Sequence, residues 1–299
     1  MDKRILGPLM LCSLGALLLL SDGQVQAKRH YSGLSTNARG TINSCSDLKF
    51  NFDDQEARVA EEHLTAPRSA VPLHVEAARN GGIEVVGWDG ADYSIAACKA
   101  AATDSQLKEI SVSVKDNNVT ADGPGGSDWT VYLIVKAHKD SNLNINAHNG
   151  PIALRRVSGK FDARSVNGPI SVEDCSGDIG ARTQNGPISM SGRGGNHELE
   201  TQNGPISVAL AGNRWGAGKV NAHTQNGPLS LEVPKEYQSG VRVEMSGHSP
   251  VTCHAAQCSK SSRTWDDENR YIEFGDASPA IHMSTVNGPV SVDSGSGEL

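Results

Sequence analysis

The stretch Thr-Gln-Asn-Gly-Pro-Ile-Ser stands unchanged at 183–189 and 201–207, and it returns at 224–230 with leucine in place of isoleucine. Its Asn-Gly-Pro core occurs six times, and the asparagines are Asn149, Asn167, Asn185, Asn203, Asn226 and Asn287. The first four follow one another at a constant interval, and longer intervals precede Asn226 and Asn287. A fixed period of this kind is typical of repeat proteins in which each unit stacks on the next.

Apolar residues recur at fixed offsets on both sides of each asparagine. Three and five positions after Asn185 stand Ile188 and Met190, with a serine between them. Before it, Ile179 and Ala181 alternate with polar residues. A period of two is typical of a half-buried strand. Each unit is therefore predicted to hold two strands joined by an Asn-Gly corner.

The corner itself has a structural interpretation. Asn and Gly both tolerate positive φ, so we expect the pair to turn the chain at low steric cost. Proline then begins the next strand, where its missing N–H does least harm. Stacking would place successive asparagines about 4.8 Å apart, close enough for a ladder of amide hydrogen bonds. A second ladder is expected along Gln184, Gln202 and Gln225.

The predicted fold is all-β, a flattened solenoid of two stacked sheets with about 18 residues per unit. A large antiparallel sheet or a sandwich of successive hairpins is the alternative, because periodicity alone does not exclude it. We expect a leader with an N-terminal cap at 28–66, an irregular β-rich first half at 67–140, and the repeats at 141–299. The cap is predicted as a strand followed by a short helix. Insertions at 211–219 and 252–272 interrupt the repeats.

Residues 1–27 have the pattern of a secretory signal peptide. Lys3 and Arg4 precede an apolar run from Ile5 to Leu20, and small residues precede a cut after Ala27. No later run is long enough to span a bilayer. The predicted location is extracytoplasmic, in the periplasm, on the cell surface or in the medium. The net charge of −7 and the lack of a basic block argue against a nucleic-acid partner.

An exported chain is expected to form disulfides. Cys253 and Cys258 are close enough in sequence to close a small loop, and Cys45 with Cys98 is the second pair that we expect. Cys175 is then left over. The sequence does not fix this connectivity.

Catalytic motifs are absent from the sequence. It has no nucleophile elbow, no zinc-protease motif and no phosphate-binding loop. Arg164, Arg182 and Glu200 fall in one outward column, where an ion pair between neighbouring coils is the simplest interpretation. We therefore predict no catalytic residue, no cofactor and no metal site.

The recurrent Asn-Gly-x-Ile-x-Val corner, the N-terminus, and GGIEVVGWDG at 81–90 before YSIAACKA at 93–100 resemble a bacterial family of exported β-strand-repeat proteins called putative adhesins, a domain of unknown function. The resemblance covers 70–295. It implies an extracytoplasmic β-helical repeat protein without an established activity, and it carries over no catalytic residue.

The leading functional hypothesis is a non-enzymatic structural or adhesion-like binding module of the bacterial envelope. Its partner would be a glycan or an envelope protein, and the aromatic residues of the insertions would make the contacts: Trp215, Trp265 and Tyr271. The alternatives are a β-helix carbohydrate-active enzyme and a periplasmic partner of an envelope-stress regulator.

Overall fold

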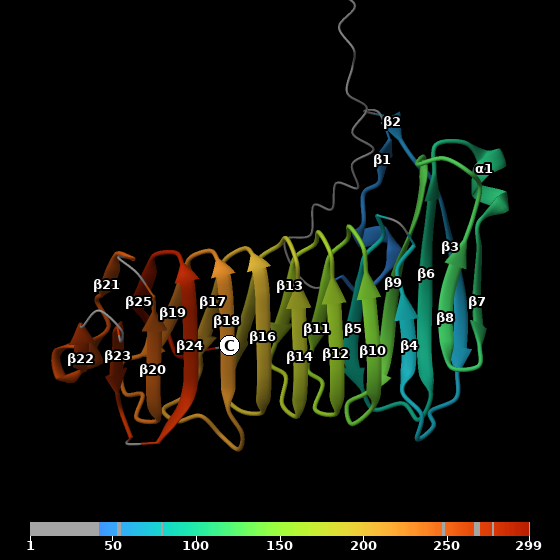
Figure 1. Cartoon of the computed structure of the whole chain (residues 1–299). Coiled ribbons are helices and arrows are strands. Elements are labelled where there is room, and N and C mark those ends of the chain that lie inside the picture. The colour runs from blue at the N-terminus through green and yellow to red at the C-terminus, as the bar shows by residue number, and fades with distance from the viewer. Residues whose placement is uncertain are drawn as a thin grey trace, which may run out of the picture. The chain divides into compact units, whose positions relative to one another are not determined.

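The structure is a computed structural model that describes residues 42–52, 55–78, 80–246, 249–265, 270–276 and 278–298. The predicted signal peptide lies outside these residues. Two large sheets, one of 12 strands and one of 11, make up the described chain (Figure 1).

The strands of the 12-stranded sheet are, in spatial order, β22 (Ser262–Trp265), β23 (Arg270–Phe274), β20 (Gly240–Met245), β24 (Pro279–Asn287), β18 (Val220–Asn226), β16 (Asn196–Asn203), β14 (Asp178–Thr183), β12 (Lys160–Ser165), β10 (Asn142–Ala147), β4 (Leu73–Glu76), β8 (Asn118–Asp122) and β7 (Ser111–Lys115). Those of the 11-stranded sheet are β21 (Val251–Cys253), β25 (Val290–Gly295), β19 (Leu229–Pro234), β17 (Ile206–Leu210), β15 (Ile188–Gly192), β13 (Ile170–Glu173), β11 (Ile152–Arg155), β5 (Ile83–Trp88), β9 (Trp129–His138), β6 (Tyr93–Ala101) and β3 (Arg58–Ala66). The remaining elements are the strand pair β1 (Asn51–Phe52) and β2 (Gln55–Glu56), helix α1 (Asp104–Glu109), and short 3-10 helices at Cys45–Asp47 and Ala256–Lys260.

Pairing within the repeats is parallel, which establishes the solenoid over the hairpin alternative. Strand β12 pairs with β14 so that Phe161 lies opposite Ile179, its equivalent in the next unit. On the other sheet β13 pairs with β15, with Ile170 opposite Ile188. Antiparallel pairs occur toward the two ends, between β7 and β8, β3 and β6, and β20 and β23. Each coil therefore contributes one strand to each sheet.

The core lies between the sheets and is built from the inward columns that the periodicity predicts. Ile188 and Ile206 from one sheet are 1% and 0% exposed, and Phe161 from the other is 1% exposed. Because equivalent residues stack directly above one another, burial is continuous along the coils and forms one hydrophobic cluster.

The last repeat does not occupy the last place in the stack. Strand β24 lies between β18 and β20, and β25 lies between β19 and β21 (Figure 1). After β19 the chain skips one place in the stack and builds a further coil from β20 and β21. It then returns, and β24 and β25 fill the skipped place between that coil and the coil of β18 and β19. The long interval between Asn226 and Asn287 therefore contains a whole coil that stacks outside the final repeat.

The asparagine corners form the amide ladder that stacking requires. The Nδ2 group of each asparagine donates to Oδ1 of the previous one at 2.9–3.0 Å, and the series begins at Asn80. Asn287 donates to Asn226, as its inserted position demands. The glutamine ladder is not formed, since no hydrogen bond joins Gln184, Gln202 and Gln225 within the described residues.

The glycine of each corner has a different role from the one expected. The corner residues do not have positive φ. A Cβ on Gly204 would lie 2.0 Å from the carbonyl oxygen of Gly186, and one on Gly186 would lie 2.3 Å from that of Gly168. Real Cβ atoms do not approach this closely. Glycine is therefore required because consecutive coils touch backbone to backbone, and not because the chain turns through a left-handed conformation.

A threonine stands two residues before Asn185, Asn203, Asn226 and Asn287, and it secures the same contact. The buried hydroxyls of Thr183, Thr201 and Thr224 donate to the glycine carbonyl of the preceding coil at 3.2, 3.0 and 2.9 Å. Each copy of the Thr-Gln-Asn-Gly-Pro sequence thus places two side-chain hydrogen bonds and one close backbone contact at its own step of the stack.

Both predicted disulfides are present, Cys45–Cys98 and Cys253–Cys258. Among the cysteines that the structure describes, Cys175 alone is free, and it is buried. Burial raises the pKa of its thiol to about 11. A thiol of this kind is inert toward disulfide exchange, because the thiolate is the reactive form.

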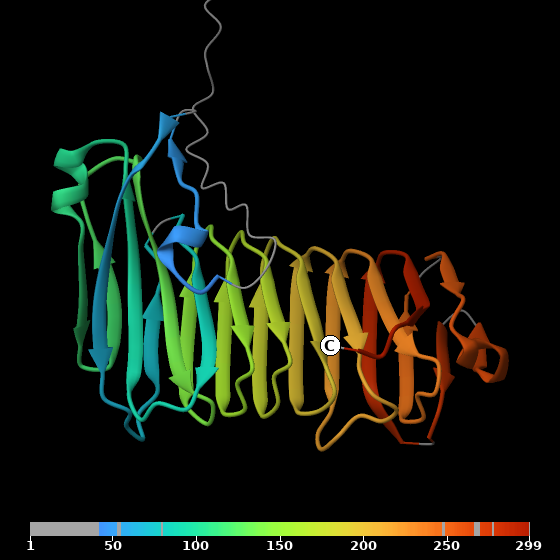
Figure 2. The same ribbon diagram turned by 180° about the vertical axis from the view of Figure 1, so that it is seen from behind.

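Residues 42–52, here called the N-terminal strap, cover the outer face of the 11-stranded sheet (Figure 2). Ile42, Phe50 and Phe52 pack with Tyr132 and Ile134, and the Cys45–Cys98 bond fixes the strap to β6. The predicted helical cap is wrong, because 58–66 form the edge strand β3, which pairs antiparallel with β6. The strap therefore covers the side of a sheet instead of the end of the stack.

A carboxyl group is buried at the outer face of the same sheet. Glu84 is 1% exposed, and its Oε1 lies 2.8 Å from Nε of Arg155. The backbone of Ile42, in the strap, also hydrogen-bonds to Glu84. Burial raises the pKa of Glu84 to about 7, although the Arg155 guanidinium opposes the shift.

The folded protein is therefore expected to lose stability as the pH rises from about 4.5 to about 7. In that interval folded Glu84 holds a proton that the unfolded chain has released, so deprotonation opposes folding, by about 3 kcal/mol at most. Glu84→Gln should flatten this part of the pH profile of the free energy of unfolding. Glu232→Gln, at an exposed position of the same sheet, is the control and should leave the profile as it is. If the pH profile of the free energy of unfolding is the same in Glu84→Gln as in the wild type, Glu84 is not the group that causes the loss of stability.

Candidate functional site

The outward side chains of β12, β14, β16, β18, β24, β20 and β23 form one exposed surface, here called the polar face. Strand pairing places one residue of each strand in a single row across it. That row is Arg164, Arg182, Glu200, His223, Ser284, Glu244 and Tyr271. Its members follow one another at the strand spacing of about 4.8 Å.

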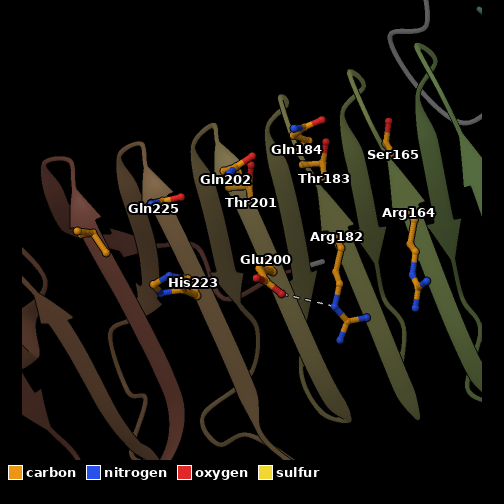
Figure 3. Close-up of a pocket in the computed structure, with 11 residues that line it drawn as sticks. Arg164, Ser165, Arg182, Thr183, Gln184, Glu200, Thr201, Gln202, His223 and Gln225 are labelled. Atoms are coloured by element: carbon orange, nitrogen blue, oxygen red, sulfur yellow. Dashed lines mark ion pairs between the residues drawn. The ribbon is translucent and has the colours of Figure 1, made fainter.

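Three hollows lie along the polar face. The first has a volume of about 500 Å³ and extends from β12 to β24, where Gln184, Gln202 and Gln225 lie beside the row that begins at Arg164 (Figure 3). The second, of about 770 Å³, adjoins it and shares Arg164 and Arg182. The third, of about 250 Å³, shares His223 and Val286 with the first and reaches Tyr271. The shared lining residues make the three hollows one continuous track across the strands.

Arg182 is the centre of an ionic cluster. Its guanidinium lies 3.2 Å from Asp162 and 3.5 Å from Glu200, and it also pairs with Glu198. Arg164 makes a two-pronged contact with Asp162 at 2.7 and 3.3 Å. Figure 3 shows Arg182 and Glu200 pointing toward each other from neighbouring strands. The cluster fixes the direction of the arginine side chains at the surface.

Gly180 contributes to the floor of the second hollow. It occupies the outward position between Asp162 and Glu198 in the neighbouring row. A Cβ there would lie 3.1 Å from a guanidinium nitrogen of Arg182. The missing side chain therefore gives Arg182 room to lie against the sheet and reach Asp162.

The charged groups of the first two hollows balance. Their lining contains four cationic and four anionic side chains. These are Lys160, Arg164, Arg182 and Lys219 with Asp162, Asp178, Glu198 and Glu200. Beside them, the amide side chains of Gln184, Gln202 and Gln225 follow one another on consecutive coils (Figure 3). An amide both donates and accepts hydrogen bonds. The polar face therefore offers many hydrogen-bonding groups and no dominant sign of charge.

The structure separates the three aromatic residues predicted to contact a ligand. Trp215 is a core residue, 6% exposed, so it offers a ligand almost no aromatic surface. Its indole nitrogen donates to the carbonyl of Gly195 at 3.1 Å, and its ring meets His197 edge-on at 5.6 Å. His197 replaces an aliphatic residue in an inward column, and the Trp215 ring also lies 3.6 Å from the position that a Cβ on Gly192 would take. Trp215 fills that region, which is why the loop folds inward.

Tyr271 and Trp265 lie on opposite sides of the terminal hairpin. Tyr271 pairs with Glu244 and joins the polar face, where its ring lies 4.1 Å from the Arg242 guanidinium carbon. Trp265 is adjacent to the partner of Tyr271 on β22, so strand alternation directs it to the other side. It is 47% exposed, with the Arg270 guanidinium 5.1 Å from its ring.

Most of the polar face was missed by analysis of the sequence. The column of Arg164, Arg182 and Glu200 was visible in the repeat, but the link to Ser284 and Glu244 depends on the inserted position of β24. The sequence did contain one signal for this surface. Three copies of the motif have glutamine at the same place, although a solvent-exposed position does not by itself require one particular side chain.

Neither a metal centre nor a membrane-spanning helix is found in the described part of the chain. No group of three His, Cys, Asp or Glu side chains there is placed to hold a metal ion. No helix there is both long and apolar enough to cross a bilayer.

No protein-family profile and no curated protein matches this sequence. The solved structures that are similar to it include three bacterial proteins. A putative cell adhesion protein from Clostridium sporogenes ATCC 15579 is 11% identical, with 80% of this chain and 100% of that chain covered and a TM-score of 0.33. A putative adhesin from Bacteroides fragilis NCTC 9343 is 9% identical (79% and 97% covered, TM-score 0.40), and one from Parabacteroides distasonis ATCC 8503 is 14% identical (79% and 97%, TM-score 0.36). Their descriptions agree with the resemblance to the putative-adhesin family, and likenesses this distant establish no function for this chain.

Proposed function

We propose that this protein is an exported, non-enzymatic binding module of the bacterial envelope, and that the polar face is its ligand-binding surface. The observation that carries the proposal is the continuous track of three hollows on one exposed sheet face. The two disulfides support an extracytoplasmic location, because such bonds form and persist in oxidising compartments. The division at residues 27, 66 and 140 stays a prediction.

The role of a binding surface fits the way in which the side chains are held. The sheet backbone beneath the polar face is fixed by parallel pairing on both sides. Arg182, one of the two side chains shared by the first two hollows, is fixed by three carboxylates. A ligand would therefore meet preorganised groups and lose little affinity to the ordering of the protein.

The first test is capture of envelope components by the mature chain, residues 28–299, from glycan arrays and solubilised envelope fractions. Arg182→Ala should weaken capture at least about tenfold, because it removes a charged hydrogen-bonding group and leaves three carboxylates without their shared partner. Arg193→Ala is the matched control, since Arg193 is exposed and pairs with Asp174 away from the polar face. Equal capture by the two variants, both shown to be folded by circular dichroism, would overturn the proposal.

A carbohydrate-active enzyme is the second candidate, because Asp162, Glu198 and Glu200 lie together around Arg182. A glycosidase needs two carboxyl groups that flank the scissile bond, whereas all three of these carboxylates are directed at the Arg182 guanidinium. Release of reducing ends from envelope glycans, abolished by Glu200→Gln, would favour the enzyme over the binding module.

A further inference from the structure

We infer that the ligand of the polar face is a linear, uncharged glycan chain that lies across the strands. This inference rests on the binding function proposed above and adds the chemical class and the direction of the ligand. Three observations carry it: the course of the track, the spacing of its side chains, and the balance of its charges.

The track runs perpendicular to the strands. Its hollows share lining residues at each junction, and together they extend from β12 to β23. Six strand-to-strand steps separate these two strands in the sheet order. At about 4.8 Å per step this distance is about 29 Å. A track of this length favours a chain molecule over a compact small ligand.

The spacing of the side chains favours a polymer of rings over a peptide. Gln184, Gln202 and Gln225 repeat on three consecutive coils, and Arg164 and Arg182 repeat on two consecutive strands. A chain whose units advance by about one strand spacing would meet the same group at every unit. In an extended peptide, side chains on one face repeat about every 6.8 Å, which falls out of step with about 4.8 Å after two or three residues.

The charge balance excludes attraction to a strongly charged polymer. Four cations and four anions line the first two hollows, and the third adds Arg242 and Arg270 against Glu244, so the track has only a small net charge to draw in a polyanion or a polycation. Hydroxyl groups both donate and accept, and so do the glutamine amides, while the arginines donate and the carboxylates accept. The array therefore matches a polyhydroxylated, neutral chain.

Tyr271 gives the track an aromatic end. It belongs to the third hollow, at the opposite end of the row from Arg164. A tyrosine combines an apolar ring with a polar tip, and although the Arg242 guanidinium covers one face of this ring, the ring adds an aromatic surface that the rest of the track lacks. A terminal sugar unit would be positioned there.

The test is titration calorimetry of the mature chain with neutral oligosaccharides, each supplied as a length series from disaccharide to octasaccharide. The probes are gluco-, manno-, galacto-, xylo- and chito-oligosaccharides, with oligogalacturonates as the charged comparison. At least one neutral series should gain affinity with each added unit and then reach a plateau when the track is filled. Its binding should change by less than about twofold between low and high salt, because few charges are neutralised.

Ser284→Trp would block the track with a bulky side chain. Ser284 lies between His223 and Glu244 in the row of outward residues and borders the third hollow. The new indole should remove the gain in affinity for long chains while short ones still bind. Ser230→Trp, on β19 of the other sheet at a similarly half-buried position, should leave the whole length series unchanged.

The outcomes separate this inference from the proposed function. A neutral series whose length dependence is lost in Ser284→Trp alone supports the inference. Tighter binding of oligogalacturonates with a steep salt dependence overturns it, and so does capture of an envelope protein with no neutral series bound. In both of these cases Arg182-dependent capture would still support a binding module. Loss of capture in every arm would overturn the inference and the proposed function together.

Discussion

Replacing Gly204 by alanine is expected to destabilise the protein by about 3 kcal/mol or more, because the new Cβ cannot be accommodated by a side-chain movement. It would lie 2.0 Å from the carbonyl oxygen of Gly186, an atom of the neighbouring coil's backbone. Relief requires the two coils to separate. That separation would break two hydrogen bonds, from the amide of Asn203 to that of Asn185 and from the hydroxyl of Thr201 to the carbonyl of Gly186.

Gly125→Ala is the matched control for this substitution. No atom lies within 4 Å of the position that its Cβ would take, and its φ is not in the left-handed region. Its free energy of unfolding should stay within about 0.5 kcal/mol of the wild-type value. Urea unfolding followed by circular dichroism measures both variants. A Gly204→Ala protein as stable as Gly125→Ala would show that the corner glycines are needed for something other than close stacking.

Removal of the Cys45–Cys98 disulfide is expected to cost about 4 kcal/mol, and removal of Cys253–Cys258 about 2 kcal/mol, by the chain-entropy relation. The difference follows from the sequence separations of 53 and 5 residues. The first bond also holds the strap against Tyr132 and Ile134, which are buried at 1% and 2% exposure. Its loss should therefore uncover apolar surface on the 11-stranded sheet.

The measurement compares two double variants, Cys45→Ala with Cys98→Ala and Cys253→Ala with Cys258→Ala. Hydrogen exchange should accelerate along β6 and β9 in the first variant and along β21 in the second. The free energies of unfolding should differ in the order given by the loop lengths. Equal losses, or unchanged exchange along β6 in the first variant, would show that strap packing does not depend on the disulfide.

The solenoid could be predicted because stacking converts one-dimensional periodicity directly into columns of neighbours. Ile170, Ile188 and Ile206 occupy one buried column for the same reason that they recur at equal intervals in the sequence. The amide ladder followed from the same register. The chemistry of the corner glycine did not, because a sequence shows that glycine is required without showing whether φ or a close contact requires it.

The strand order and the strap depended on long-range contacts that no local pattern encodes. Nothing in the residues around Asn287 indicates that β24 returns inside β20, since its apolar columns would fit any position in the stack. Trp215 was assigned to the surface because it lies in a loop. The space beside Gly192 and His197 that its indole fills exists only once the coils have assembled.

The most direct measurement of the central claim is carboxyl footprinting of the mature chain with and without its captured ligand. Carbodiimide labelling followed by mass spectrometry reports how accessible each carboxylate is. If the polar face binds the ligand, labelling of Glu198 and Glu200 should fall by severalfold while labelling of Glu232, exposed on the other sheet, stays constant. Protection of Glu232 with Glu198 and Glu200 unchanged would place the ligand on the opposite face and contradict the account.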